Sequence, residues 1–290
     1  MESLQERPVR PSELDQQPDQ PPDQRSDQQP DQESMRARAG RWWTDPARRV
    51  VSSRFEARET AYFAHAAVDV LLRHVHGPVR AVLDVGCGPG RALAVAAARV
   101  PGVRLIGVDP DPAALAEARC LLAGVADTLL LRGRAEDLTG GSAPTVPAPV
   151  DAALVLLNLA LWDERLSPLR AIVDLLGPGG VLLVLDLVAP TDAATHATWF
   201  GFGSDPDEQA YLTDQMAAWP TAQEHRALAT ELARHPRAAE VRLALTGLYD
   251  VGAGAPQWAG PPFAEESPAV PGVPRAALLL VRAASPVARS

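Results

Sequence analysis

The sequence predicts an α/β fold in which a doubly wound parallel sheet has helices on both faces. Five short runs are rich in Val, Leu and Ala, as expected of strands that are buried on both faces. Helical segments separate the runs, and this alternation is typical of parallel sheets. The runs are Val82–Val85, Val103–Val108, Leu129–Leu131, Asp151–Asn158 and Val181–Asp186.

The segments around these runs carry helix signals. Residues 46–76 have apolar side chains at three- and four-residue steps, which predicts a helix with one apolar face before the first strand. Asp111-Pro112 is a cap followed by a proline at the first helical position. Ser167-Pro168 repeats this pattern, and Gly177 is expected to end that helix.

The first run ends in a carboxylate and enters a glycine turn. Asp84 is followed by Gly86, Gly88 and Gly90 at alternate positions. Because glycine has no side chain, such a turn lets the backbone approach a ligand closely. Arg91 stands where a dinucleotide fingerprint has Gly or Ala, which disfavours NAD.

The second run also ends in an acid. Asp109 and Pro110 follow it, and an acid at this place commonly accepts hydrogen bonds from the hydroxyl groups of a ribose. Alternatively, Asp109 and Asp111 are both turn residues. We expect Asp111 to be the helix cap and Asp109 to be the ligand.

Together these residues resemble motif I and the neighbouring motifs of the class I S-adenosylmethionine-dependent methyltransferases. The resemblance is strong over residues 82–187. It implies that the cofactor is S-adenosyl-L-methionine and that the glycine loop faces its methionine part. It also implies a seven-stranded sheet, whose last two strands would be Val241–Leu245 and an antiparallel Ala276–Val281.

The segment Leu129–Leu138 resembles the family's third motif, whose strand end contacts adenine. Here the sequence departs from the family, since Arg134 stands where many relatives carry an acid that accepts from the adenine amino group. Glu136 or Asp137 is the alternative acceptor.

Composition divides the chain into a tail and one domain. Residues 11–34 repeat an Asp-Gln-Pro theme and contain almost nothing apolar, so they cannot bury enough surface to fold. We expect a disordered tail over residues 1–40 and one domain over 41–290. The tail lacks the apolar region of a signal peptide, and no long apolar stretch predicts a membrane span, so a cytoplasmic protein is expected.

Charge and cysteine content restrict the chemistry. The net charge of −9 argues against nucleic acid as a partner. Seven arginines lie between residues 36 and 58, and they either form a solvated helix face or bind phosphate. All 27 basic residues are arginine, which excludes lysine Schiff-base chemistry. Cys87 and Cys120 suit neither a disulfide framework nor a metal site, and no metal is expected.

Aromatic residues predict where a substrate would bind. Trp42, Trp43 and Tyr62 precede the glycine loop, in a region that covers the cofactor cleft in this family. Residues 188–219 hold Trp199 and Phe200 with further aromatic residues, and they are longer than a plain strand-to-helix connection. We interpret them as an inserted helical lid. The alternative is a dimer interface, so a homodimer is possible.

Methyl transfer needs alignment and exclusion of water more than it needs acid–base chemistry. If the acceptor is a hydroxyl group, a base helps, and His196 is the first candidate, ahead of His65, Asp186 and Glu164. Asn158 and Trp162 lie at the carboxyl end of the fourth strand and are expected to face the methyl group or the acceptor.

The expected function is methyl transfer from S-adenosylmethionine to a small molecule, as in secondary metabolism. One alternative is a non-methylating, cyclase-like member of the fold that uses the cofactor structurally. The other is a binding or assembly protein whose tail and aromatic residues serve a partner.

Overall fold

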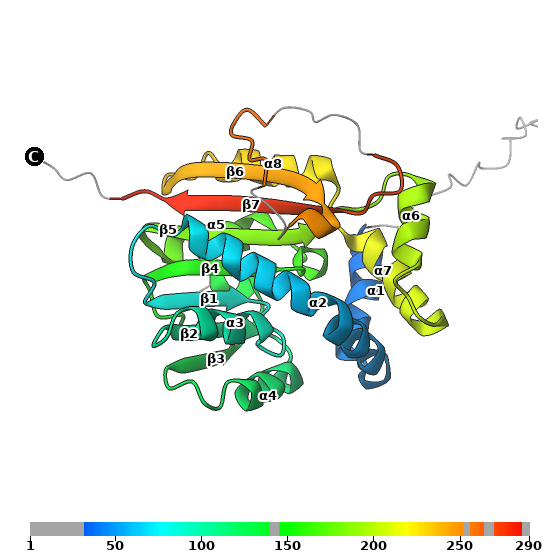
Figure 1. Cartoon of the computed structure of the whole chain (residues 1–290), viewed down its shortest axis with the longest axis horizontal. Helices are drawn as coiled ribbons and strands as arrows, with labels where there is room; N and C mark the ends of the chain where they lie inside the picture. The colour runs from blue at the N-terminus through cyan, green and yellow to red at the C-terminus, as the bar shows by residue number, and fades with distance from the viewer. Residues whose placement is uncertain (1–31, 140–144, 252–255, 264–269, 286–290) are drawn as a thin grey trace, which may run out of the picture. The chain divides into compact units, whose positions relative to one another are not determined.

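A computed structural model describes residues 32–139, 145–251, 256–263 and 270–285 (Figure 1). Seven strands form one sheet in the order β3-β2-β1-β4-β5-β7-β6. They are β1 (Ala81–Val85), β2 (Arg104–Asp109), β3 (Thr128–Arg132), β4 (Val150–Leu156), β5 (Leu176–Leu187), β6 (Ala238–Gly247) and β7 (Arg275–Ala283). The predicted seven-stranded α/β fold is confirmed.

Strand direction also agrees with the prediction. Strands β1 to β5 pair in parallel, whereas β7 is antiparallel to both β5 and β6. The strand order reverses between β1 and β4, and open α/β sheets bind their ligands outside the carboxyl ends of the strands at such a point. The glycine turn follows β1, and Asn158 follows β4, so both lie at this point.

Side chains alternate between two apolar layers along each strand. Ala152 and Leu154 of β4 face one layer, and Ala153 and Val155 face the other, as the two-residue period of a strand requires. The first layer contains α2 (Pro46–His74) and α3 (Arg91–Arg99), and the second contains α5 (Leu166–Leu175) and α8 (Ala222–Leu232). Helix α4 (Pro112–Leu121) and the short helices η1 (Glu136–Thr139), η2 (Leu159–Leu161) and η3 (Leu248–Asp250) complete this part.

Three helices gather at the carboxyl ends of the parallel strands (Figure 1). They are α1 (Gln32–Thr44), α6 (Ala193–Phe200) and α7 (Pro206–Ala218). The last two lie within the predicted 188–219 insertion, which is therefore helical. Helix α7 begins after the cap Asp205, and α8 begins with a capping box of Thr221 and Glu224.

The domain includes residues that were predicted to belong to the tail. Helix α1 begins at Gln32, and its Ala39 is fully buried in the first apolar layer. Gln215 of α7 donates a hydrogen bond to the Ala39 carbonyl at 3.1 Å. Residues 32–40 therefore belong to the domain and were wrongly assigned to the tail, because composition could not show that α7 supplies a packing surface. The rest of the predicted tail, residues 1–31, lies outside the described residues.

Helix α5 begins earlier than its Ser-Pro signal indicated. Glu164 accepts hydrogen bonds from the backbone N–H groups of Leu166 and Ser167, at 2.7 and 2.6 Å, and so moves the start of the helix toward the N-terminus. Partial burial raises the pKa of Glu164, but hydrogen bonds from Ser167 and its neighbours prevail and leave the pKa below the usual value. Gly177, expected to end the helix, lies in β5.

Candidate functional site

The glycine turn is held against β2 and leaves its outer side open. The backbone N–H groups of Gly86 and Cys87 both donate to the Val108 carbonyl, at 2.7 and 3.1 Å. Gly86, Gly88 and Gly90 have φ angles of 77°, 51° and 79°, which L side chains rarely adopt. A Cβ atom at Gly88 would meet nothing within 4 Å, so the turn faces open space there.

Asn158, which follows β4, fixes the same turn. Its Nδ2 donates to the carbonyl of Val85 at 2.8 Å and to that of Gly86 at 3.3 Å. A Cβ atom at Gly86 would lie only 1.9 Å from this Nδ2, so the contact requires glycine. Asn158 Oδ1 is buried and has no partner among the described residues. The Asn158 amide group thus anchors the turn through Nδ2, whereas its Oδ1 remains without a hydrogen-bond donor.

Asp109 lies where β2 ends and contacts the glycine turn directly. Its carboxylate accepts hydrogen bonds from the N–H groups of Gly88 and Asp111, both at 2.8 Å. Burial raises its pKa, and these two hydrogen bonds oppose the rise. Each oxygen keeps a lone pair for a ligand hydroxyl. Pro110 is exposed, and Asp111 caps α4 as predicted.

Asp84 is a buried acid beneath the turn. Its side chain is 2% exposed, and its Oδ1 has no partner within the described part of the chain. Burial, with a contribution from Asp109, raises its pKa to about 7. A positively charged ligand near the turn would lower the pKa of Asp84 again, because an opposite charge favours the ionised carboxylate.

The end of β3 carries a polar cluster. Glu136 accepts a hydrogen bond from the Asp163 N–H at 2.9 Å, and Asp137 accepts one from the Arg134 N–H at 2.7 Å. The Arg134 guanidinium donates to the Asp163 carboxylate at 2.9 Å. Glu136 and Asp137, the two predicted adenine acceptors, therefore also hold this loop in place.

The described residues also form an aromatic cavity of about 170 Å³. Its lining comes mainly from α2, α6 and α7, with Trp43 from α1. Leu157, the neighbour of Asn158, also lines it and has an unusual φ of 56°. Eight aromatic side chains contribute to the wall: Trp43, Phe55, Tyr62, Phe63, Trp199, Phe202, Tyr211 and Trp219.

Some of the residues that were predicted to line the substrate site lie in the cavity wall, and others do not. Trp43, Tyr62 and Trp199 line it. Trp42 is buried beside it and donates from Nε1 to Asp214 at 2.8 Å. Phe200 lies outside the lining, with its ring centre 4.9 Å from that of His196.

Two predicted catalytic residues also lie outside this lining. His196 is exposed on α6. Trp162 is 5% exposed and packs in the second apolar layer, with α5 and α8. Of the three predicted catalytic residues, Asn158 is thus the one that contacts the glycine turn.

Sequence reasoning missed Glu56, which is the one carboxyl group among the lining residues. Burial raises its pKa to about 8, Arg91 opposes the rise, and Asp109 adds to it. Glu56 therefore lies within electrostatic reach of both the cavity and the acid of the glycine turn. Its position seven residues before Phe63 puts it on the apolar helical face, and an acid there was the available signal.

Ion pairs join α2 to the insertion beside this cavity. Glu208 of α7 is fully buried and accepts hydrogen bonds from Arg54 Nε at 2.9 Å and Arg58 Nη2 at 3.0 Å. Hydrogen bonds from Arg58 and Ser204 hold the pKa of Glu208 well below its usual range, against the effect of burial. Two arginines of the predicted basic run thus pair with an acid of the same chain.

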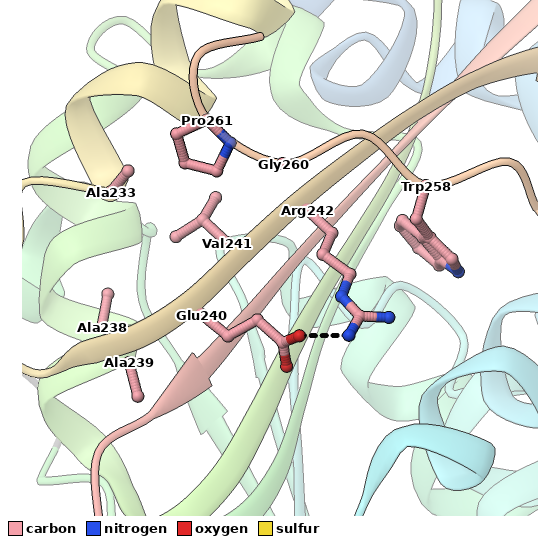
Figure 2. Close-up of a pocket in the computed structure, with 9 residues that line it drawn as sticks. All are labelled: Ala233, Ala238, Ala239, Glu240, Val241, Arg242, Trp258, Gly260 and Pro261. Atoms are coloured by element: carbon pink, nitrogen blue, oxygen red, sulfur yellow. Dashed lines mark ion pairs between the residues drawn. The ribbon is translucent and has the colours of Figure 1, made fainter.

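A second hollow lies along the edge strand β6 (Figure 2). It has a volume of about 340 Å³ and is lined by Trp258, Pro261 and both members of the Glu240–Arg242 ion pair. Glu240 also accepts from Arg282 at 2.9 Å. This hollow shares no lining residue with the aromatic cavity, and its carboxylate is already paired.

Two absences concern the described residues only. None of the helices over 32–139, 145–251, 256–263 and 270–285 is long and apolar enough to cross a membrane. Within the same ranges, no three His, Cys, Asp or Glu side chains are grouped so that they could hold a metal ion.

Comparisons with known proteins point to one family. The family model of the methyltransferase domain matches residues 83–182. The chain is 31% identical over 198 residues to a trans-aconitate 2-methyltransferase of Methylobacterium radiotolerans, with 60% of this chain and 71% of the relative covered. It is 34% identical over 179 residues to the enzyme of that name from an Acidovorax species, covering 60% of this chain and 62% of the relative.

A solved structure shares the fold. The plantazolicin methyltransferase BamL, in complex with a triazolic desmethylPZN analog and SAH, superposes with a TM-score of 0.69 at 18% identity. The match covers 87% of this chain and 96% of that chain. With the sheet order, the glycine turn and the sequence relatives in agreement, the chain belongs to the class I S-adenosylmethionine-dependent methyltransferases.

Proposed function

We propose that this methyltransferase binds S-adenosylmethionine along the glycine turn and a small-molecule acceptor in the aromatic cavity. The proposal rests on one observation, which is that consecutive residues connect the cavity to the turn. Leu157 lines the cavity, and the next residue, Asn158, holds the turn. Glu56 lines the same cavity and interacts electrostatically with Asp109.

The residues around the turn fit this cofactor. The open side of Gly88 leaves room for the methionine part, and the Asp109 oxygens can accept from the ribose hydroxyls. Asp84 is buried and Glu56 is half-buried, and a cationic ligand would favour the ionised form of both acids. Pro110 and either Glu136 or Asp137 would border the ribose and the adenine. When bound, the cofactor supplies an activated methyl group on a sulfonium.

The protein's own contribution is orientation and exclusion of water. The insertion supplies Trp199, Tyr211 and Trp219, which are 4%, 6% and 8% exposed, so these rings face the protein interior. That burial favours a lid over an exposed dimer interface. If the acceptor group is a hydroxyl, the Glu56 carboxylate is the base in the cavity that can take its proton.

A second candidate acceptor is trans-aconitate, which the names of the sequence relatives suggest. A tricarboxylate needs cationic partners when it leaves water. The lining offers one arginine, Arg58, and Glu208 already holds it. We therefore favour an apolar acceptor.

The test is formation of S-adenosylhomocysteine from S-adenosylmethionine, measured with 7-hydroxycoumarin and with trans-aconitate as acceptors. We expect product with the hydroxycoumarin and little with trans-aconitate. Cofactor binding without product from either acceptor would favour the non-methylating alternative. Absence of cofactor binding would contradict the proposal and leave an assembly role.

A further inference from the structure

One residue beside the glycine turn is held at both of its backbone polar groups. The N–H of Leu159 donates to the Asp186 carboxylate at 3.0 Å, and Arg165 Nε donates to the Leu159 carbonyl, also at 3.0 Å. Asp186 and Arg165 are both buried, and neither is among the lining residues of the aromatic cavity. We call these two side chains the Leu159 clamp.

The clamp follows a segment with an unusual backbone conformation. Leu157, two residues earlier, has a φ of 56°, which leucine rarely adopts. In this conformation Leu157 lines the cavity, while the next residue, Asn158, donates to the glycine turn. A strained backbone persists only where the surrounding structure holds it. The clamp supplies such a hold immediately after the strained segment.

Arg165 also reaches the end of the insertion. Its Nη2 donates to the Ala218 carbonyl at 3.1 Å, and its Nη1 donates to Glu224 of α8 at 3.0 Å. Ala218 is the last residue of α7, and the next residue, Trp219, lines the cavity. Because a guanidinium presents its donors in a rigid plane, these bonds fix the end of α7 relative to Leu159.

Burial of the two clamp groups is costly. It raises the pKa of Asp186 to about 7, against the opposing effects of the Leu187 N–H, Arg165 and the Leu159 N–H. Apolar side chains of similar volume are often at least as stabilising as buried ionic groups. Directed hydrogen bonds, in contrast, fix the backbone in one geometry, and this is what the clamp contributes.

We propose that Arg165 and Asp186 are positioning residues, which hold Leu159 in place for methyl transfer. With Leu159 held, Asn158 supports the cofactor turn and Leu157 keeps its place in the wall of the acceptor cavity. The proposal rests on the function proposed above and names the residues that set the relation between its two sites. The clamp acts on the cofactor through Asn158.

Titration calorimetry of S-adenosylhomocysteine tests this role. Arg165→Gln removes the guanidinium and should lower the affinity roughly threefold to tenfold, as expected when about one hydrogen bond to the turn is weakened. Arg165→Lys keeps a charged donor and should recover part of the lost affinity. Asp186→Asn has one carboxamide oxygen for two backbone N–H groups, so it should cause a loss similar to that of Arg165→Gln. If Arg165→Gln does not fold, the Lys and Asn variants carry the comparison.

Arg282→Gln is the matched control. Arg282 also joins a carboxylate and a backbone carbonyl, since it donates to Glu240 at 2.9 Å and to the His74 carbonyl at 2.7 Å. It lies opposite Val181 of β5, five residues before Asp186, and so away from the carboxyl end of that strand. This variant should lose stability and keep the wild-type affinity for S-adenosylhomocysteine.

A double variant shows whether the clamp acts through Asn158. Asn158→Ala removes the contact with the turn and should itself weaken binding. Adding Arg165→Gln to Asn158→Ala should then lower the affinity by less than about twofold more. Hydrogen exchange of the Leu159 N–H in the ligand-free protein adds a readout that needs no ligand. Exchange should be faster in Arg165→Gln and Asp186→Asn than in wild type, and unchanged in Arg282→Gln.

Three results would overturn the proposal: wild-type affinity in the clamp variants, an equal loss of affinity in Arg282→Gln, or the full effect of Arg165→Gln in the Asn158→Ala background. Failure of the underlying function has a different signature. In that case S-adenosylhomocysteine does not bind to the wild type, or it binds and 7-hydroxycoumarin does not. Hydrogen exchange at Leu159 then still decides whether the clamp holds this segment, and unchanged exchange in both clamp variants would refute it.

Discussion

The glycine turn and the aromatic cavity meet at Asn158 and Leu157, but the chain builds them in opposite ways. The turn, its acid Asp109 and strands β1 and β2 come from residues 81–109, and apart from the anchor Asn158 their contacts are mostly to backbone. The cavity assembles side chains from α1, α2, α6 and α7, and ion pairs and aromatic contacts hold these helices together. The first region depends on local backbone geometry, whereas the second depends on tertiary packing.

Replacing Gly86 by Ala should have the largest effect and should act on the turn. The new Cβ would collide with Asn158 Nδ2 in addition to straining a φ of 77°. We expect a loss of about 3 kcal/mol in the free energy of unfolding and at least a tenfold loss of cofactor affinity. Urea unfolding and titration calorimetry measure the two effects.

Gly102→Ala is the matched control for the backbone strain that a side chain causes at a positive φ. Gly102 has a φ of 78°, but a Cβ there would meet nothing within 4 Å. This variant should lose only about 1 kcal/mol and keep its cofactor affinity. Equal losses in both variants would show that the Asn158 contact contributes nothing.

Asp84→Asn should change how stability depends on pH. The pKa of Asp84 is raised to about 7, so the folded state binds its proton more tightly than the unfolded state does. Its contribution to stability is therefore present below about pH 4 and is lost as pH rises toward 7. The wild type should lose about 2 kcal/mol more than Asp84→Asn between about pH 5 and about pH 7.

Urea unfolding at the two pH values measures this difference. Asp186 and Glu56, whose pKa values are about 7 and about 8, contribute slopes of the same sign in both proteins, so the comparison isolates Asp84. Saturating S-adenosylmethionine should reduce the wild-type slope, because its cation favours the ionised acid. If stability falls equally with pH in wild type and Asp84→Asn, the raised pKa of Asp84 is contradicted.

Glu208→Gln should disturb the cavity and spare the turn. Glu208 is buried and accepts from both Arg54 and Arg58, so the neutral variant weakens the link between α2 and α7. We expect a loss of about 1 kcal/mol in stability, weaker 7-hydroxycoumarin binding and nearly unchanged cofactor affinity. Calorimetry with both ligands checks this.

Glu231→Gln is the control for that change. Glu231 pairs with Arg170 and Arg234 near the surface of α8, where ion pairs contribute little. It should alter neither ligand's affinity. If Glu208→Gln weakens cofactor binding as much as it weakens hydroxycoumarin binding, the two regions are not separable.

Deleting residues 1–31 should have the smallest effect. Their composition supports no core, and α1 begins only at Gln32. Stability should change by less than about 0.5 kcal/mol, and both ligand affinities should be kept. A large fall in the thermal midpoint would show that this segment contributes to the domain.

The difference between the regions also explains what the sequence could predict. The strands and the cap at Asp111 are local patterns, and the structure confirms both. The contact of Asp109 with Gly88 was also predictable, because β1 and β2 are neighbouring parallel strands and these residues lie at their carboxyl ends.

The cavity depended on packing between segments far apart in the chain. Tyr62 lies on the helix predicted over residues 46–76, but no pattern predicted the helix that carries Trp43 or showed that Trp42 turns toward Asp214. Glu56 was missed, because nothing local indicates that residues of α7 line a cavity with it. The helix over residues 32–40 was missed for the same reason.

Cofactor affinity in two variants tests the separation of the sites most directly. Titration calorimetry of S-adenosylmethionine would compare wild type, Asp109→Ala and Trp199→Ala, each shown to be folded. The account predicts roughly tenfold to hundredfold weaker binding for Asp109→Ala, because the ribose hydroxyls lose their acceptor, and wild-type affinity for Trp199→Ala. Unchanged affinity in Asp109→Ala, or an equal loss in Trp199→Ala, would contradict it.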